Sequence, residues 1–133
     1  MATLRILVPD GTTNYIKNPS LRYDTSDWNA LGSTVTRTLT RARFGVASLQ
    51  VVTAGTSLNE GAFFRVSALN GVSDNITISV YARGNGEVRL RLDDNSIGGN
   101  EYISQPVQLN DKRWTRLTVS GRCHGGNDVR QVV

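Results

Sequence analysis

The chain has 133 residues, 38% of them hydrophobic, which suits one domain of ordinary size with a single two-layer core. No run approaches the 18 apolar residues of a membrane span, and the apolar stretch before Pro9 is too short for a secretory signal. We therefore expect neither membrane insertion nor export by the general pathway.

The formal net charge is +4, with 13 Arg against 2 Lys. Because these Arg are scattered among acidic residues and no nucleic-acid-binding motif occurs, we predict no nucleic-acid partner and favour a solvated surface or an Arg-rich protein interface.

In chain order, the first predicted element is TLRILV (residues 3–8), a candidate strand within residues 1–13, which we interpret as an N-terminal extension or arm before a domain at 14–133. Helical periodicity is nearly absent, whereas alternating apolar and polar residues recur between turn-forming segments. This pattern predicts strands at STVTRTLT (33–40), ASLQVVT (47–53), GAFFRVSA (61–68), NITISVYARG (75–84), EVRLRLDD (87–94), YISQPVQL (102–109), RWTRLTVSG (113–121) and DVRQVV (128–133). About 8–9 short strands of this kind indicate an all-β, two-sheet antiparallel sandwich.

The clearest alternation flanks the turn GNG at residues 84–86. Apolar residues occupy every second position both in 76–82 and in 88–92. We therefore predict that the two segments form an antiparallel hairpin with one buried face and one solvent-exposed face, which we call the wet face. Residues of like parity across a hairpin share a face. The wet face would then gather Tyr81, Arg83, Arg89 and Arg91.

The last predicted strand, at 128–133, runs to the end of the sequence without a turn or a polar tail. A terminal strand of this kind would present an unpaired apolar edge. We therefore expect it to pair with another chain or to be completed by further C-terminal residues.

Residues that could carry catalysis are few. Cys123 is the single cysteine, which excludes an internal disulfide, and it stands beside the single histidine, His124. Adjacent residues on an extended chain face opposite sides, so nucleophile and base are not expected to meet, and two soft ligands are too few for zinc. Asp93 and Asp94 are also neighbours, whereas the two carboxylates of a glycosidase face each other across a cleft. We predict no catalytic residue, no metal, no cofactor and no enzymatic activity.

Four motifs follow one another in a distinctive order: NPSLRYDTSDW (18–28), GVASLQV (45–51), VSALNGVSDNITISVYARGNGEVRLRL (66–92) and RWTRLTVSG (113–121). The set resembles jelly-roll carbohydrate-binding modules, which have a galactose-binding-like β-sandwich and are found beside bacterial glycosidases and in tailed-phage structural proteins. The resemblance runs from about Asn14 to Val133. It implies a jelly-roll topology and places Trp28 and Trp114 at positions that usually pack into or seal the core. We also expect Asn18 and Pro19 to help clamp the entering chain onto the sandwich.

The resemblance also raises the question of calcium, because the family commonly has an acidic residue after Asn-Pro-Ser-Phe that helps hold a structural calcium ion. Here Leu21 and Arg22 stand at these positions. Calcium requires about six or more oxygen ligands, and a guanidinium group would repel it. We therefore expect no calcium, with Arg22 paired instead with Asp24, Asp27 or the end of the last strand.

Sugar binding in this family relies on rings stacked against exposed aromatic side chains, with polar groups around them. The predicted wet face, with Tyr81, Arg83, Arg89 and Arg91, therefore suits an acidic or polyhydroxylated ligand, and equally a neighbouring protein, since Tyr and Arg are enriched at interfaces. Further ligand candidates are Asn100 and Tyr102. Of the adjacent Phe63 and Phe64, one is expected to face the core.

These observations favour a non-enzymatic phage virion structural protein, a capsid decoration or tail component that assembles with copies of itself or other virion proteins and contacts a cell-surface polysaccharide of the host. The alternative is an accessory glycan-binding module of a bacterial glycoside hydrolase. The first hypothesis places the protein in the virion, the second outside the cell as part of a larger secreted protein.

Overall fold

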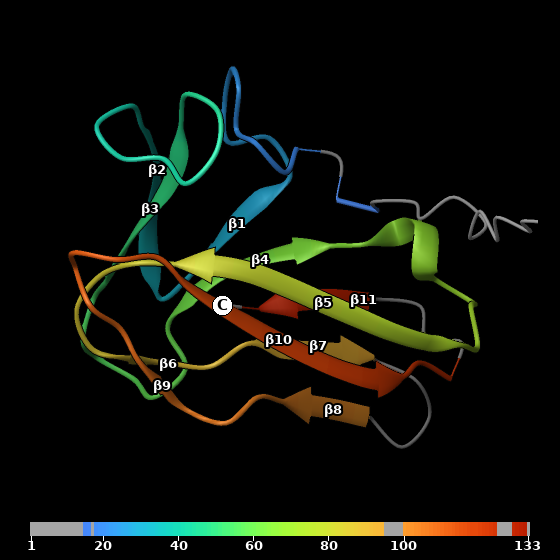
Figure 1. The fold of residues 1–133 in the computed structure, drawn as a ribbon. Helices are drawn as coiled ribbons and strands as arrows, with labels where there is room; N and C mark the ends of the chain where they lie inside the picture. Colours follow the sequence, from blue (N-terminus) through green and yellow to red (C-terminus); the bar gives the residue numbers. More distant parts are fainter. Residues whose placement is uncertain (1–14, 17, 95–99, 125–128, 133) are drawn as a thin grey trace, which may run out of the picture.

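The computed structural model describes residues 15–16, 18–94, 100–124 and 129–132 (Figure 1). The expected arm at 1–13 and its candidate strand lie outside the described residues. The described chain forms the strands β1 (Trp28–Leu31), β2 (Ser33–Thr38), β3 (Ser48–Thr53), β4 (Gly61–Arg65), β5 (Asn75–Ala82), β6 (Glu87–Val88), β7 (Arg91–Asp94), β8 (Asn100–Ile103), β9 (Val107–Gln108), β10 (Thr115–Arg122) and β11 (Val129–Val132), with one 3-10 turn at Ser67–Leu69. No helix with the length and apolarity of a membrane span occurs within these residues.

The strands are arranged in two main layers. A five-stranded antiparallel sheet has the order β1-β4-β11-β7-β8, and the long antiparallel pair β5-β10 crosses in front of it (Figure 1). Two further antiparallel pairs, β2-β3 and β6-β9, extend the structure at one end. The predicted all-β, two-sheet antiparallel sandwich is thus confirmed.

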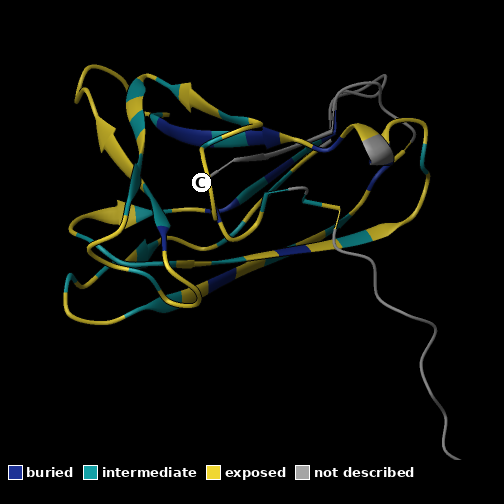
Figure 2. Ribbon diagram, turned by 90° about the horizontal axis from the view of Figure 1, so that it is seen from above, coloured by how far each residue is buried: buried dark blue, intermediate teal, exposed yellow. Residues whose placement is uncertain are grey.

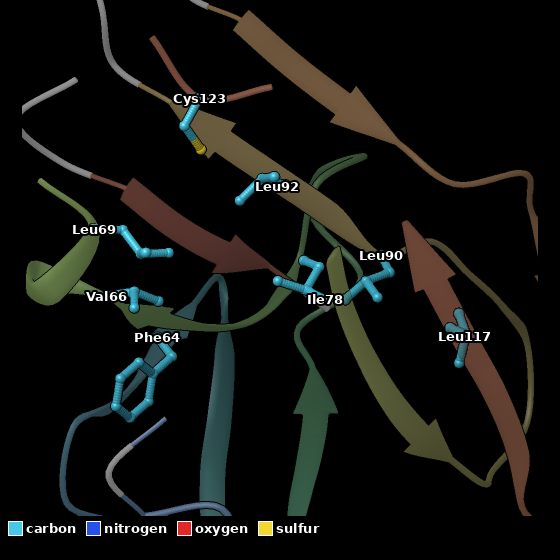
Figure 3. Packing of buried hydrophobic residues seen from close by; sticks show 8 residues of the cluster. All are labelled: Phe64, Val66, Leu69, Ile78, Leu90, Leu92, Leu117 and Cys123. Carbon is cyan, nitrogen blue, oxygen red and sulfur yellow. The ribbon is translucent and has the colours of Figure 1, made fainter. Parts of the chain in front are cut away.

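The core lies between the two layers. Phe64 and Leu92 come from the five-stranded sheet, Ile78 and Leu117 from the β5-β10 pair, and all four are at most 8% exposed. Figure 3 shows these side chains gathered with the other buried members of the cluster, Val66, Leu69, Leu90 and Cys123. In Figure 2 the exposure changes along the β5-β10 strands in the alternating way that a half-buried strand requires.

The predicted hairpin between residues 75–83 and 87–94 is wrong. β5 pairs along its whole length with β10, and the segment 87–94 pairs instead with 100–108. That second hairpin is interrupted: Glu87 pairs with Gln108 and Arg91 with Ile103, so four steps along one strand oppose five along the other, the count of a β-bulge. The alternating segments on the two sides of the Gly turn are therefore both strands, but they belong to different sheets and do not pair with each other.

The strand count exceeds the predicted 8–9 for two reasons. The bulge divides each of two predicted strands, giving β6 and β7 from 87–94, and β8 and β9 from the region of 102–109. The sequence WNAL of β1 carries no alternation, and this strand was not predicted.

The expected exposed edge at the end of the chain is also absent. β11 pairs with β4 on one side and with β7 on the other, so it lies inside the five-stranded sheet. Its backbone donors and acceptors are turned toward neighbouring strands of the same chain, and it offers no edge for another chain to extend.

Candidate functional site

Tyr81 lies near the end of β5, on the outer face of the β5-β10 pair. Residues of β5 alternate between the core and the outside, with Ile78 buried and Tyr81 38% exposed. In the strand register, Tyr81 stands directly opposite Arg116 of β10. Directly paired residues project to the same face of an antiparallel pair, so Tyr81 and Arg116 are neighbours on the outer surface.

The connection between β2 and β3 brings a second aromatic side chain to Tyr81. Phe44 is 64% exposed, and its ring centroid lies 5.8 Å from that of Tyr81 at an interplanar angle of 77°, an edge-to-face contact. The guanidinium carbon of Arg43 lies 4.3 Å from the Phe44 centroid and 5.0 Å from the Tyr81 centroid. Both distances are typical of cation–π contacts, so one guanidinium group is held by two rings.

Two further guanidinium groups come from residues close in the chain to these rings, Arg41 near Phe44 and Arg83 near Tyr81. Arg83 Nε and Arg41 Nη1 both donate to the main-chain oxygen of Asp111, at 2.5 Å and 3.5 Å. Because they share one acceptor, these two side chains are neighbours although 42 positions of sequence separate them. Arg116 Nη2 lies 3.5 Å from Ser79 Oγ, on the same outer face as Tyr81.

We call this set the aromatic–arginine patch; its members are Arg41, Arg43, Phe44, Tyr81, Arg83 and Arg116. Within the described residues, none of its four guanidinium groups forms an ion pair with a carboxylate. The patch therefore combines exposed ring surface with positive charge that the protein itself does not neutralise.

A row of hydroxyl groups continues the patch along the outer face. Ser79 and Thr77 of β5, and Thr118 and Ser120 of β10, are all exposed, and the hydroxyl groups of Thr77 and Ser120 lie 2.7 Å apart. Each strand has eight residues, so the face is about 26 Å long at a rise of roughly 3.3 Å per residue. An extended polymer could contact rings at one end and hydroxyl groups along the rest.

A hollow of about 330 Å³ lies between the 18–28 loop and the β2–β3 connection, lined by Ser20, Arg22, Gly45 and Val46. Because Gly45 follows Phe44 directly, the hollow adjoins the patch. Its volume is at the lower end of the range for small-ligand sites, enough for a side branch of a larger ligand.

The predicted wet face is divided between two layers. Tyr81 and Arg83 belong to the patch, but Arg89 lies between β6 and β7, and Arg91 is on β7 of the five-stranded sheet. The four residues therefore do not form one surface, since β5 pairs with β10 and not with β7. Arg91 is moreover neutralised, with Nη2 3.5 Å from Asp93 Oδ2 and Nη1 3.7 Å from Glu101 Oε1.

Tyr102, the other aromatic ligand candidate, faces the opposite layer. It pairs with the inward-facing Leu92, packs against the core cluster, and its hydroxyl donates to the main-chain oxygen of Arg122 at 2.9 Å. A Cβ atom at Gly121 would lie 2.1 Å from its ring, so the ring occupies the space that only glycine leaves open. Asn100, the first residue of β8, pairs with Asp94.

The stretch at 18–28 forms a loop held by Asn18 and Trp28. Asn18 Nδ2 lies 3.1 Å from the main-chain oxygen of Asp24 and 3.3 Å from that of Ser26, while Trp28 Nε1 donates to the oxygen of Asn18 at 3.2 Å. The Trp28 ring meets Phe64 edge to face at 5.5 Å. These contacts are what a clamp on the entering chain requires.

The remaining predicted structural positions are less enclosed. Pro19 lies exposed in the turn that opens this loop, and Trp114 is partly buried just before β10. Of the adjacent phenylalanines, Phe64 is 2% exposed and Phe63 only partly buried, as expected for neighbours on a strand.

The residues present do not fit the calcium ion that the family resemblance raises. Arg37 of β2 donates from Nε to the main-chain oxygen of Leu21 at 2.6 Å and from Nη2 to that of Arg22 at 2.5 Å. A guanidinium group thus holds two main-chain oxygens of this loop, and its positive charge opposes the binding of a cation there. Arg22 itself shows no ion pair with Asp24 or Asp27 among the described contacts; its guanidinium carbon lies 5.3 Å from the Tyr23 ring.

The adjacent pairs of chemistry-bearing residues are separated by the fold. Cys123 is fully buried while His124 is exposed, and burial, with the nearby Asp94 carboxylate, raises the pKa of the Cys123 thiol. Asp94 is also fully buried and accepts the main-chain N–H of His124 at 2.5 Å, whereas Asp93 lies on the outer face with Arg91. The described residues contain no group of three or more His, Cys, Asp or Glu suited to a metal.

Sequence reasoning missed four members of the patch, Arg41, Arg43, Phe44 and Arg116. The segment RARF at 41–44 did carry a signal, an aromatic residue between cations in a segment without strand alternation, where an apolar side chain has no core to enter. Arg116 could have been found only by knowing that β10 is the partner of β5.

Comparison with models of known protein families finds no match, and none of the curated proteins matches the sequence. Solved structures do match. The tandem CBM22-1–CBM22-2 domain of Paenibacillus barcinonensis Xyn10C superposes with a TM-score of 0.68 at 21% identity, over 85% of this chain and 38% of that one. Its CBM22-1 xylan-binding domain gives the same TM-score and identity, over 85% of this chain and 78% of that one.

A third match has further modules attached. The CBM22-1–GH10 modules of the Clostridium thermocellum endo-1,4-β-D-xylanase 10B, complexed with xylohexaose, superpose with a TM-score of 0.67 at 16% identity, over 86% of this chain and 24% of that one. None of the three structures is a phage protein. At these identities the likeness concerns the fold: the chain has the β-sandwich of CBM22 carbohydrate-binding modules.

Proposed function

We propose that this domain is a non-catalytic polysaccharide-binding module whose binding surface is the aromatic–arginine patch. The observation that carries the proposal is the exposed edge-to-face pair of Phe44 and Tyr81 on the outer face of the β5-β10 sheet. Exposed rings beside polar groups are what a sugar ring needs for stacking and hydrogen bonding. The proposal also draws on the fold, since the matching modules are described as xylan-binding domains.

The hydroxyl groups along β5 and β10 support a polymer rather than a single sugar. They extend the patch over a face of about 26 Å, so successive sugar units would contact successive strand positions. In this proposal the domain works outside the cell as an accessory part of a larger secreted protein, and it brings that protein to a polysaccharide.

The test is native affinity electrophoresis of the chain in gels that contain xylan, mixed-linkage glucan or other plant and bacterial polysaccharides. We expect retardation by at least one polymer, and a loss of about tenfold or more in affinity for Tyr81→Ala and for Phe44→Ala, because a central aromatic contact is typically worth more than 1.4 kcal/mol. The matched control is Tyr15→Ala, which removes a tyrosine that is 45% exposed outside the patch.

Two results would overturn the proposal. One is the absence of retardation by every polymer tested with a folded protein. The other is binding that Tyr81→Ala and Phe44→Ala leave unchanged, because the binding surface would then lie elsewhere. Thermal unfolding of each variant should match that of the parent chain, since both rings are exposed.

A second candidate function is that of a virion structural protein, in which the same patch would contact another protein. The enrichment of Tyr and Arg at protein interfaces favours it. Sedimentation velocity distinguishes the two: self-association that Tyr81→Ala abolishes, together with no affinity for polysaccharide, would favour the structural role.

A further inference from the structure

We infer that the polysaccharide recognised at the aromatic–arginine patch is acidic, a polymer that carries carboxylate groups on its sugar units, as uronic acid residues do. This inference rests on the proposed function and narrows its ligand class. It follows from the charge of the patch and from the way in which its guanidinium groups are held.

The patch is positive and contains few balancing charges. Six cationic side chains belong to it or directly follow Asp111 in the chain: Arg41, Arg43, Arg83, Arg116, Lys112 and Arg113. The acidic residues closest to these elements in the sequence are Asp111, whose main-chain oxygen accepts from two of the arginines, and Glu87 at the start of β6. Positive charge gathered on one face raises the local concentration of an anionic ligand.

Arg43 is the group most available to a ligand. Its guanidinium is placed by two aromatic rings, and within the described residues it donates no hydrogen bond and forms no ion pair. Contact with the rings uses none of the hydrogen-bond acceptors of the protein, so the N–H donors of this guanidinium stay available within the described residues. A guanidinium fixed in this way loses little conformational freedom when a carboxylate binds.

The other guanidinium groups are held by neutral acceptors. Arg83 and Arg41 donate to the main-chain oxygen of Asp111, and Arg116 to Ser79 Oγ. A neutral acceptor orients a guanidinium without cancelling its charge. Each group therefore keeps the capacity for a charge-assisted, bidentate contact with a carboxylate, which is stronger than a hydrogen bond to a sugar hydroxyl.

The position of the charges relative to the rings fits a sugar acid. In a uronic acid the carboxylate is attached to the same ring whose face can stack on an aromatic side chain. Arg43 lies within 5.0 Å of both ring centroids, so one sugar unit could contact a ring and a guanidinium group together. A neutral sugar would use the rings but leave this charge unpaired.

The experiment compares matched polymers of the same backbone. Glucuronoxylan and polygalacturonate are each offered to the chain before and after carbodiimide–borohydride reduction, which converts the carboxyl groups to alcohols. We expect about tenfold or tighter affinity for the carboxylated member of at least one pair, and that this preference shrinks when sodium chloride rises from about 0.05 M to about 0.5 M.

Three variants separate the patch from the overall positive charge of the chain. Arg43→Gln and Arg116→Gln should each weaken binding of the carboxylated polymer severalfold and weaken binding of the reduced polymer much less, so that the preference for the carboxylated member shrinks. Arg65→Gln removes the same charge from β4, in the other layer, and should have little effect on either polymer.

The outcomes distinguish this inference from the proposed function. Equal affinity for the carboxylated and reduced polymers overturns the acidic ligand and leaves polysaccharide binding intact. No binding to these pairs or to any neutral polymer overturns both. Equal loss of binding in all three Arg variants, or binding of single-stranded DNA as tight as that of the acidic polymer, would show a general polyanion effect and would also overturn the inference.

Discussion

Two outer faces of this sandwich carry arginine side chains, and the contacts of these side chains differ between the two faces. On β7 and β8, Arg91 lies within 3.7 Å of both Asp93 and Glu101, and its side chain is 23% exposed. On the outer face of β5 and β10, Arg43 of the β2–β3 connection contacts aromatic rings, while Arg83 and Arg116 contact neutral oxygens. On the first face the charge of Arg91 is balanced within the fold, whereas on the second face the described contacts include no carboxylate partner for the arginines. Within the described residues, ion-paired arginines and arginines without a carboxylate partner thus lie on different faces of the sandwich.

The largest effect, on the free energy of unfolding, is expected for a substitution in the core between the layers that carry these two faces. Replacing Gly121 with Ala would place a Cβ 2.1–2.5 Å from three ring carbons of Tyr102. Overpacking of this kind costs about 1–3 kcal/mol, and chemical denaturation should show that loss in the free energy of unfolding. Combining Gly121→Ala with Tyr102→Leu should recover part of the stability. If Gly121→Ala unfolds like the parent chain, the close packing of Tyr102 on β10 is not as described.

The next prediction concerns a substitution that gives the β5-β10 face an ion pair like the one on β7 and β8. Ser79→Asp introduces a carboxylate where Arg116 Nη2 now lies 3.5 Å from the hydroxyl oxygen. An internal partner for Arg116 should weaken binding of an acidic polymer roughly tenfold, or about 1.4 kcal/mol, and weaken binding of a neutral polymer, which loses only the Ser79 hydroxyl group, to a smaller extent. Thr34→Asp, on the exposed side of β2, supplies the same charge change away from the patch. Equal effects of the two substitutions would contradict a local role.

The converse substitution frees the paired arginine. Asp93→Asn with Glu101→Gln leaves Arg91 without its two carboxylate partners. Because such partly exposed ion pairs contribute less than about 1 kcal/mol each, stability should change little in thermal unfolding. Affinity for acidic polymers should also stay unchanged, because none of the cation–π contacts among the described residues involves Arg91. A clear gain in affinity would mean that unpaired charge alone is sufficient.

The most local prediction concerns a carboxylate that is held by peptide N–H groups. Main-chain hydrogen bonds from Gly55 and Thr56 lower the pKa of Glu60 from its ordinary 4.5 to about 2, with Thr56 Oγ1 and the N–H of Ser57 adding to the effect. A lowered folded-state pKa means that this contribution is present above about pH 4.5 and is lost as the pH falls through 2.

Hydrogen exchange of the amides at 55–57 measures this effect. Protection should fall between pH 4.5 and 2 in the parent chain after correction for the intrinsic exchange rate. In Glu60→Gln the same amides should be less protected throughout, with no dependence on pH in that range. A parent chain that shows constant protection down to pH 2 would argue against the carboxylate as the anchor of this loop.

Local sequence patterns determined much of the fold. Alternation located β2, β3, β4, β5 and β10 within a few residues, and the ordered motifs indicated a jelly-roll carbohydrate-binding fold. The periodicity of 2 is a property of the strand itself, so it survives whichever partner the strand takes. The same reasoning predicted that one of the adjacent Phe63 and Phe64 faces the core, and the structure shows that it is Phe64.

Which strands pair with each other could be seen only in the tertiary structure. The sequence placed Tyr81 and Arg83 on a wet face, yet it could not show that Arg116 lies opposite Tyr81 or that the 41–44 segment folds over it. Pairing depends on which buried faces fit together across the whole core, and residues far apart in sequence compete for it. The aromatic–arginine patch exists because β5 pairs with β10. The same pairing leaves Arg91 in the other sheet, where it forms ion pairs with Asp93 and Glu101.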